Sequence, residues 1–217
     1  MYDLILILAG YLFGSIPFGL IIAGLSGVKN LRQIGSGNIG ATNVYRAAGL
    51  LPAVIVTLLD ILKGVLPVLA VGAWGGGLIA EIEYLKLAVG AAAILGHIFP
   101  IYIGFRGGKG VNTALGVFIT ILPLPTLIAM AVFILIVSVS RYISLGSVLA
   151  AIALAAVVVF FRVFSVGDIH TVYIPTSLLL MVLIIFTHRS NLKRLFRGTE
   201  NKFSFHSRAV DGAKSNG

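Results

Sequence analysis

The chain of 217 residues is 59% hydrophobic and only 11% charged, and it contains no cysteine. A soluble domain carries about 25% charged residues, so this composition excludes a soluble globular protein and indicates an integral membrane protein. The lack of cysteine excludes disulfides, thiolate metal sites and a cysteine nucleophile. The net charge of +9 would suggest nucleic acid as the partner of a soluble protein. Here the cations lie between and after the apolar runs, so membrane orientation explains them and we expect no nucleic-acid partner.

Seven apolar runs are predicted to be membrane-spanning helices. They occupy residues 4–25, 50–71, 87–103, 111–122, 124–139, 145–161 and 172–186. No Lys or Arg precedes the first run, so we interpret it as a retained helix and not as a cleaved signal. We expect one transmembrane domain over residues 1–205, followed by a polar, disordered tail over 206–217.

The apolar segment 111–139 is interrupted by Pro123 and Pro125, and it can be one kinked helix or two short ones. A single crossing would separate the basic C-terminal segment from the cations of the first loop, against the tendency of cationic loops to stay in the cytoplasm. Two crossings keep these loops together. We therefore expect an all-α, seven-transmembrane-helix bundle with the N-terminus outside and the C-terminus cytoplasmic. The run 111–122 would rise only about 18 Å, so some helices are expected to be short or re-entrant.

Asp60, Lys63 and His97 fall within the apolar runs. Asp60 and Lys63 are three positions apart, on neighbouring positions of one helix face, and can neutralise each other. Such a pair is either a functional site or a structural pin, and we favour the structural interpretation. His97 lies near the end of the third run, and we interpret it as a hydrogen-bonded structural group.

The stretch 104–110 places Arg106 and Lys109 among four glycines. Glycine backbone approaches a ligand closely and can turn consecutive N–H groups toward one oxyanion. We therefore predict that Arg106, Gly107, Gly108 and Lys109 bind phosphate. The stretch is not a nucleotide-binding P-loop, because its spacing is shorter and glycine follows the lysine where a magnesium-binding hydroxyl belongs. Taken alone, it can equally be a turn whose cations lie at the membrane surface.

Segment 35–46 is polar, rich in glycine and almost uncharged. Its short side chains can donate hydrogen bonds to anionic or carbonyl oxygens, and a short interfacial helix over 43–48 would add free N–H groups. A plain series of turns is the alternative, which the length of the run makes weaker. The candidate ligands are Ser36, Asn38, Thr42, Asn43 and Arg46.

Segment 188–200 follows the last apolar run. His188 and Asn191 share one helical face, and Arg194 lies about one turn from Asn191. A proton carrier, an amide and a cation are thus close together, which sets His188 apart from an ordinary structural histidine. In the expected topology, this segment and the two polar segments before it converge at the cytoplasmic end of the bundle, where we predict the functional site.

Three segments resemble the signatures of a known family, the bacterial membrane glycerol-3-phosphate acyltransferases that use acyl phosphate (the PlsY family). They are GSGNIGATNVYR at 35–46, GHIFP through GFRGGKG at 96–110, and HRSNLKRL through GTE at 188–200. The segment RYISLGS at 141–147 is similar to a further family segment. The resemblance spans nearly the whole chain.

The resemblance implies transfer of an acyl group from acyl phosphate to the sn-1 hydroxyl of glycerol 3-phosphate, giving lysophosphatidic acid and phosphate, the first acylation of phospholipid synthesis. It also implies seven helices in the bacterial cytoplasmic (inner) membrane, with glycerol 3-phosphate, acyl phosphate and membrane lipid as partners. We expect no cofactor and no metal ion, because acids are scarce in the cytoplasmic segments. The oligomeric state stays open.

The catalytic candidates are Asn191, His188 and Lys109. Asn191 or Asn38 would donate a hydrogen bond to the developing oxyanion. The hydroxyl proton would go to His188 or to the donor's own phosphate oxygen, and both alternatives stay open. The candidates for substrate binding are Ser36, Asn38, Thr42, Asn43, Arg46, Arg106, Gly107, Gly108, Ser147 and Arg194.

Two other interpretations are weaker. A transporter of phosphorylated metabolites would need polar residues along the depth of the bundle, whereas they cluster at one end. His206 and Asp211 have the H-x-x-x-x-D spacing of other acyltransferases, but they lie in the polar tail without an apolar frame, so we expect no catalytic role for them.

Overall fold

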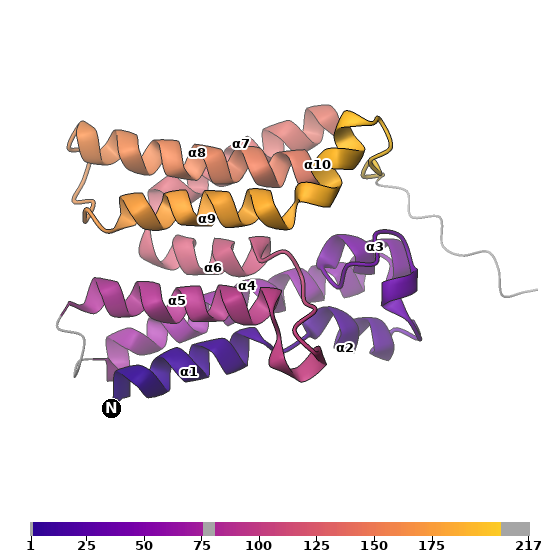
Figure 1. Cartoon of the computed structure of the whole chain (residues 1–217), viewed down its shortest axis with the longest axis horizontal. Helices are drawn as coiled ribbons and strands as arrows, with labels where there is room; N and C mark the ends of the chain where they lie inside the picture. The colour runs from indigo at the N-terminus through magenta and orange to yellow at the C-terminus, as the bar shows by residue number, and fades with distance from the viewer. Residues whose placement is uncertain (1, 76–80, 205–217) are drawn as a thin grey trace, which may run out of the picture.

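A computed structural model describes residues 2–75 and 81–204 of the chain (Figure 1). All regular secondary structure in these two ranges is helical. The α-helices are α1 (Tyr2–Gly14), α2 (Phe18–Leu25), α3 (Ala41–Ala48), α4 (Leu50–Trp74), α5 (Ile82–Ile98), α6 (Val111–Ile121), α7 (Pro123–Ser140), α8 (Ile143–Val163), α9 (Tyr173–Thr187) and α10 (Arg189–Phe196). Two 3-10 turns, η1 (Leu31–Gln33) and η2 (Ile101–Ile103), precede α3 and α6.

Five helical stretches of the described chain are long and apolar enough to cross a membrane. They are Tyr2–Leu25, Leu50–Trp74, Ile82–Ile103, Pro123–Ser140 and Ile143–Val163. A sixth results if α9 and α10, which are bent by 60° relative to each other, form one span, and α6 is a shorter apolar helix. The protein is therefore an all-helical integral membrane protein with five to six candidate spans and one short helix. The expected count of seven crossings stays a prediction.

Proline accounts for two differences between the helices and the sequence expectation. The first apolar run is broken between α1 and α2, because Pro17 has no backbone N–H and disfavours helical geometry at the residue before it. The third helix ends at Ile98 and not at residue 103, just before Pro100. Proline also separates α6 from α7, where Pro123 occupies a first-turn position that tolerates it.

The short helix α6 lies at the centre of the bundle. Figure 1 shows it between one group formed by α7, α8 and α9 and another formed by α1, α4 and α5. Its residues Val117 and Phe118 are buried in the largest hydrophobic cluster, which draws on α4, α5, α7, α8 and α9 as well. A helix too short to cross the hydrocarbon layer is thereby covered by its neighbours.

Glycine allows α4 and α6 to approach closely. A Cβ atom on Gly64 would lie 2.2 Å from the carbonyl oxygen of Thr113, and one on Gly116 would lie 2.1 Å from that of Ile61. Small residues of this kind let helix backbones meet inside a membrane. The contact fixes α6, and with it the loop that precedes α6, against α4.

The charged pair Asp60–Lys63 in α4 contacts the break between α1 and α2. Lys63 and Asp60 lie 2.9 Å apart and are each 2% exposed. The Nζ of Lys63 also donates a hydrogen bond of 3.1 Å to the carbonyl oxygen of Ile16, which lies between α1 and α2. This contact favours the structural interpretation of the pair.

Candidate active site

A cavity of about 350 Å³ is formed where the three polar segments meet. The first turn of α3, the beginning of α8 and the residues around α10 contribute to its wall. The predicted site residues that line it are Ser36, Asn38, Thr42, Asn43, Arg46, Lys109, Ser147, His188, Asn191 and Arg194. The three segments that the sequence predicts to converge are therefore brought to one site.

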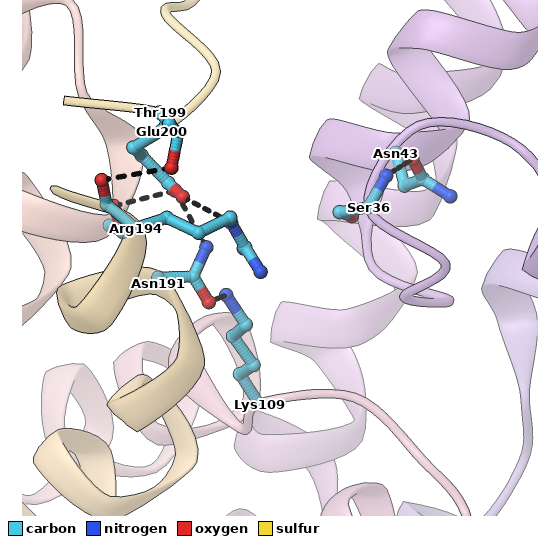
Figure 2. A network of polar contacts seen from close by, with 8 residues as sticks. Ser36, Asn43, Lys109, Asn191, Arg194, Thr199 and Glu200 are labelled. Atoms are coloured by element: carbon cyan, nitrogen blue, oxygen red, sulfur yellow. Dashed lines mark hydrogen bonds and ion pairs between the residues drawn. The ribbon is translucent and has the colours of Figure 1, made fainter. Parts of the chain in front are cut away.

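One wall of the cavity is a hydrogen-bonded network centred on Asn191 (Figure 2). Lys109 Nζ donates a 2.5 Å hydrogen bond to Oδ1 of Asn191, and Nδ2 of Asn191 donates one of 2.7 Å to Glu200. The same carboxylate accepts hydrogen bonds from Ser144 Oγ at 2.9 Å and from Arg194 Nε at 2.8 Å. We call these five residues the Asn191 network. Two cations and one carboxylate are thus held in fixed positions around one amide.

The opposite wall is the 35–46 segment. Asn43 is buried and holds this loop in shape, because its Oδ1 accepts the N–H of Ser36 at 3.0 Å and its Nδ2 donates to the carbonyl oxygen of Leu31 at 3.1 Å. Asn38 Oδ1 accepts the N–H of Gly40 in the same way, just before α3 begins. Figure 2 shows Ser36 and Asn43 on the far side of an open space from Lys109 and Arg194. Asn43 therefore holds the 35–46 segment in the conformation that forms this wall of the cavity.

His188 joins the cavity at the bend between α9 and α10. The side chain is only 2% exposed, and its Nδ1 lies 2.9 Å from the carbonyl oxygen of Ile184. Because a carbonyl oxygen can only accept, Nδ1 carries the proton and Nε2 has the free lone pair. The residue before it, Thr187, donates from Oγ1 to the carbonyl oxygen of Lys109 at 3.2 Å, which ties α9 to the glycine-rich stretch.

Burial and neighbouring charge set the protonation of the network. Burial lowers the pKa of Lys109 to about 8, an effect that Glu200 opposes and that Arg194 and Arg46 reinforce. Burial also lowers the pKa of Arg46 below its ordinary value, with Glu200 acting in the opposite direction. Burial raises the pKa of Glu200, but hydrogen bonds from Asn191, Arg194 and Ser144 outweigh that effect and hold it below its usual range. Near neutral pH the cavity carries an excess of positive charge, which suits anionic substrates.

Three predicted site residues are placed elsewhere. Arg106, Gly107 and Gly108 are described by the structure but do not line the cavity. Arg106 is exposed, and its carbonyl oxygen accepts a 2.6 Å hydrogen bond from Nη2 of Arg32. The N–H groups of Gly107 and Gly108 donate to backbone carbonyl oxygens at the end of α5. A role for these three residues in binding phosphate stays a prediction that the cavity geometry does not favour.

Sequence reasoning did not assign Glu200 to the site, although it accepts three of the hydrogen bonds in the Asn191 network. It is the only acid in the basic segment 188–200, and that contrast was the available clue. Ser144 was also missed, because only the fold brings the start of α8 to the end of segment 188–200. Phe203 also lines the cavity and packs its ring against Tyr45, with centroids 5.1 Å apart.

A second, apolar cavity of about 120 Å³ adjoins the first. Both cavities are lined by Val111, Asn112, Phe133 and Ser147, so they meet along the start of α6, the middle of α7 and the first turns of α8. Residues of α6 to α9, such as Phe118, Met130, Leu154 and Leu180, form the rest of the apolar wall. A polar space for anions thus continues into a space suited to hydrocarbon.

The described residues include no group of three or more His, Cys, Asp or Glu side chains that could hold a metal ion. The predicted polar tail, with His206 and Asp211, lies outside the described residues.

The fold and the joined cavities define an integral membrane protein with a cationic site next to an apolar one. The family described as glycerol-3-phosphate acyltransferase matches residues 4–198 of the chain. Two similar proteins, both called glycerol-3-phosphate acyltransferase, come from Geobacter sulfurreducens (46% identical, 93% of this chain and 97% of that one) and Trichlorobacter lovleyi (49%, 91% and 95%).

The chain is also similar to solved structures. A crystal structure of PlsY, an integral membrane glycerol 3-phosphate acyltransferase, in its glycerol 3-phosphate form is 40% identical, with a TM-score of 0.82 over 94% of this chain and 96% of that one. Its lysophosphatidic acid form is 38% identical, with a TM-score of 0.81 over 95% and 98%. The chain belongs to the PlsY family of glycerol-3-phosphate acyltransferases, as its three sequence signatures predict.

Proposed function

We propose that this cavity transfers the acyl group of an acyl phosphate to the sn-1 hydroxyl of glycerol 3-phosphate. The hydroxyl oxygen attacks the acyl carbon, and the bond between that carbon and the phosphate oxygen breaks. The products are lysophosphatidic acid and inorganic phosphate. The observation that carries the proposal is the Asn191 network, which faces the 35–46 segment across one cationic cavity that continues into an apolar one.

The cations suit two phosphate-bearing substrates. Lys109, Arg46 and Arg194 influence one another electrostatically, and Glu200 is the acid among them. Charge-assisted hydrogen bonds from such groups are stronger than neutral ones, and arginine can bind a phosphate through two parallel bonds. The hydroxyl of Ser36 and the first turn of α3 add donors from the opposite wall.

The acyl chain belongs in the apolar cavity between α6, α7, α8 and α9. Ser147 and Asn112 lie where the two cavities join, so the carbonyl group of the donor would lie beside them while its phosphate reaches the cations. Burial of hydrocarbon there contributes roughly 0.8 kcal/mol for each CH₂ group removed from water.

Positioning supplies much of the rate, because phosphate is already a good leaving group and no covalent acyl-enzyme is required. Holding the hydroxyl close to the acyl carbon replaces a bimolecular encounter. Lys109, oriented by Asn191, donates to the developing oxyanion, and Asn38 is the alternative donor. The hydroxyl proton goes either to Nε2 of His188 or to the departing phosphate.

The decisive assay uses purified protein with glycerol 3-phosphate and either acyl phosphate or acyl-CoA. We expect lysophosphatidic acid and inorganic phosphate in equal amounts from acyl phosphate, and no product from acyl-CoA. Phosphate release that does not depend on glycerol 3-phosphate would contradict acyl transfer. Uptake of glycerol 3-phosphate into vesicles without any acylated product would favour a transporter instead.

The expected topology is a further part of the proposal. We place the N-terminus outside and the C-terminus in the cytoplasm of the bacterial inner membrane, with α6 and α7 as separate crossings and residues 1–205 as a single domain. Cysteines introduced at positions 37, 106 and 190, which are not buried, should be labelled only from the cytoplasmic side. Labelling of any of them from outside intact cells would overturn this topology.

A further inference from the structure

The glycine-rich stretch folds back on the end of α5. The N–H of Gly107 donates to the carbonyl oxygen of Ile98, and that of Gly108 donates to the carbonyl oxygen of His97, both at 3.0 Å. These two N–H groups are therefore already bonded to α5. The presence of glycine at positions 107 and 108 therefore needs a reason other than backbone N–H groups that bind phosphate.

The side chain of His97 fills the space where Gly108 would carry a side chain. A Cβ atom on Gly108 would lie 2.1 Å from Nε2 of His97 and 2.9 Å from Cε1. Real Cβ atoms essentially never approach other atoms this closely, so a side chain at position 108 requires the imidazole ring or the loop to shift. The ring itself is 6% exposed, and nothing as bulky as a methyl group fits between it and the loop.

The other edge of the His97 ring faces α4. Its Nδ1 lies 3.6 Å from Oδ1 of Asp60, an electrostatic contact between two buried groups. Asp60 is held in turn by Lys63 at 2.9 Å. The ring thus spans the distance from a fixed charged pair on one helix to the loop on the other side.

The position of Lys109 depends on the contact between His97 and Gly108. The carbonyl oxygen of Lys109 accepts a hydrogen bond from Thr187, and its ammonium donates one to Asn191. Its backbone nitrogen is joined directly to Gly108. Displacement of Gly108 by the width of a methyl group therefore moves the origin of the Lys109 side chain. A shift of about 1 Å in a positioned group can cost on the order of 100-fold in rate.

We propose that His97 is a positioning residue of the acyl transfer reaction: its ring supports Gly108 and so fixes Lys109 against Asn191. Glycine is needed at position 108 because of this ring and not because a phosphate group contacts it. The inference rests on the proposed function of the cavity, but it concerns a contact that can be tested separately.

The test is a pair of substitutions that restores the fit. Gly108→Ala should lower kcat/KM about 10- to 100-fold, mainly through a higher KM for glycerol 3-phosphate, because Lys109 is displaced. His97→Ala alone should also raise KM, because the loop loses its support. The double variant His97→Ala/Gly108→Ala should be at least about fivefold more active than Gly108→Ala, since the added methyl group then has room.

Gly72→Ala is the matched control, because a Cβ at Gly72 meets nothing within 4 Å. It should keep wild-type kinetics. Size-exclusion profiles and thermal unfolding in detergent establish that each variant is folded. If Gly108→Ala cannot be purified, an unchanged KM in His97→Ala overturns the proposal and a raised KM supports it.

Wild-type activity in Gly108→Ala would overturn the inference, and so would a folded double variant no more active than Gly108→Ala. The second outcome would instead fit a glycine that contacts phosphate. Failure of the wild-type protein to acylate glycerol 3-phosphate would refute the proposed function. In that case calorimetric binding of glycerol 3-phosphate to the same variants still tests the contact, with the double variant again expected to bind more tightly than Gly108→Ala.

Discussion

Lys109 and Asn191 are 82 residues apart in the sequence, yet Nζ of the lysine donates a hydrogen bond to Oδ1 of the asparagine. The other end of the same amide donates to Glu200. A side-chain amide can accept from a cation through its oxygen and donate to an anion through its nitrogen at once. Asn191 therefore keeps the two opposite charges of the cavity apart while it orients both.

Asn191→Ala should remove this orientation without unfolding the protein. We expect kcat/KM for acyl transfer to fall by about 100- to 1,000-fold, the usual scale for loss of oriented stabilisation in an active site. Steady-state assays of purified protein measure the effect. Asn30→Ala, on an exposed residue outside the cavity, should retain full activity. Normal turnover by Asn191→Ala would remove this residue from the mechanism.

Glu200→Ala should lower the stability of the fold around the cavity. The side chains of Asn191, Arg194 and Ser144 lose their shared acceptor, and such hydrogen bonds to a charged group contribute about 1.5–3 kcal/mol. Thermal unfolding in detergent at pH 7 should show a lower Tm for the variant. Equal melting temperatures would mean that the carboxylate is not a stabilising centre.

The difference in Tm between wild type and Glu200→Ala should depend on pH. Despite burial, which acts to raise it, hydrogen bonding holds the folded-state pKa of Glu200 below its ordinary value. The stabilisation is therefore complete above the unfolded pKa of about 4.3 and is lost as the pH falls through the lower folded value. The gap in Tm between wild type and Glu200→Ala should narrow only under acid conditions. A gap that narrows toward alkaline pH would contradict this assignment.

Lys109 should limit activity at alkaline pH. Burial lowers its pKa to about 8, so the free enzyme loses this cation as the pH rises through that value. If the charged form binds substrate, kcat/KM should decrease above this pH and approach a tenfold loss for each further pH unit. Lys109→Arg keeps its charge over the whole range and should show no such decrease, whatever its absolute rate. A wild-type profile that is flat to pH 9.5 would exclude a required ammonium.

The sequence predicts that Arg46 and Arg106 both bind substrate, but the structure leads us to expect this role for Arg46 alone. Arg46 is half-buried and lines the cavity, whereas Arg106 is exposed and lies outside it. Arg46→Gln should raise the KM for a phosphate-bearing substrate at least about tenfold, the effect of one charge-assisted contact. Arg106→Gln should change KM less than about threefold. A larger increase in KM for Arg106→Gln than for Arg46→Gln would show that the loop containing Arg106 contacts substrate outside this cavity.

The contact between α4 and α6 should be sensitive to added volume. A methyl group on Gly116 would meet the carbonyl oxygen of Ile61 at 2.1 Å, so Gly116→Ala should destabilise the protein by about 1–3 kcal/mol. Gly72→Ala, on α4 but in open space, should not lower the Tm. Equal melting curves for the two variants would mean that the helices can separate without cost.

The sequence by itself determined the class of protein, the approximate positions of the helices and the three polar segments of the site. Hydropathy over about 20 residues is a local property. An apolar segment of that length forms a helix in a hydrocarbon layer, because its backbone polar groups must then bond to one another. Proline placed the division between α6 and α7 for the same local reason. The polar segments carry enough short and cationic side chains to indicate anionic substrates before any coordinates are known.

Only the tertiary structure decided which members of those segments meet. Hydropathy does not specify how each helix is rotated or where a loop folds back, because these depend on packing between residues distant in the chain. Thus Glu200 became an acceptor shared by α8 and α10, and the glycines at 107 and 108 turned toward the end of α5 and away from the cavity. The hydrogen bond from Lys63 to the carbonyl oxygen of Ile16, at the break before Pro17, depends on the same long-range packing.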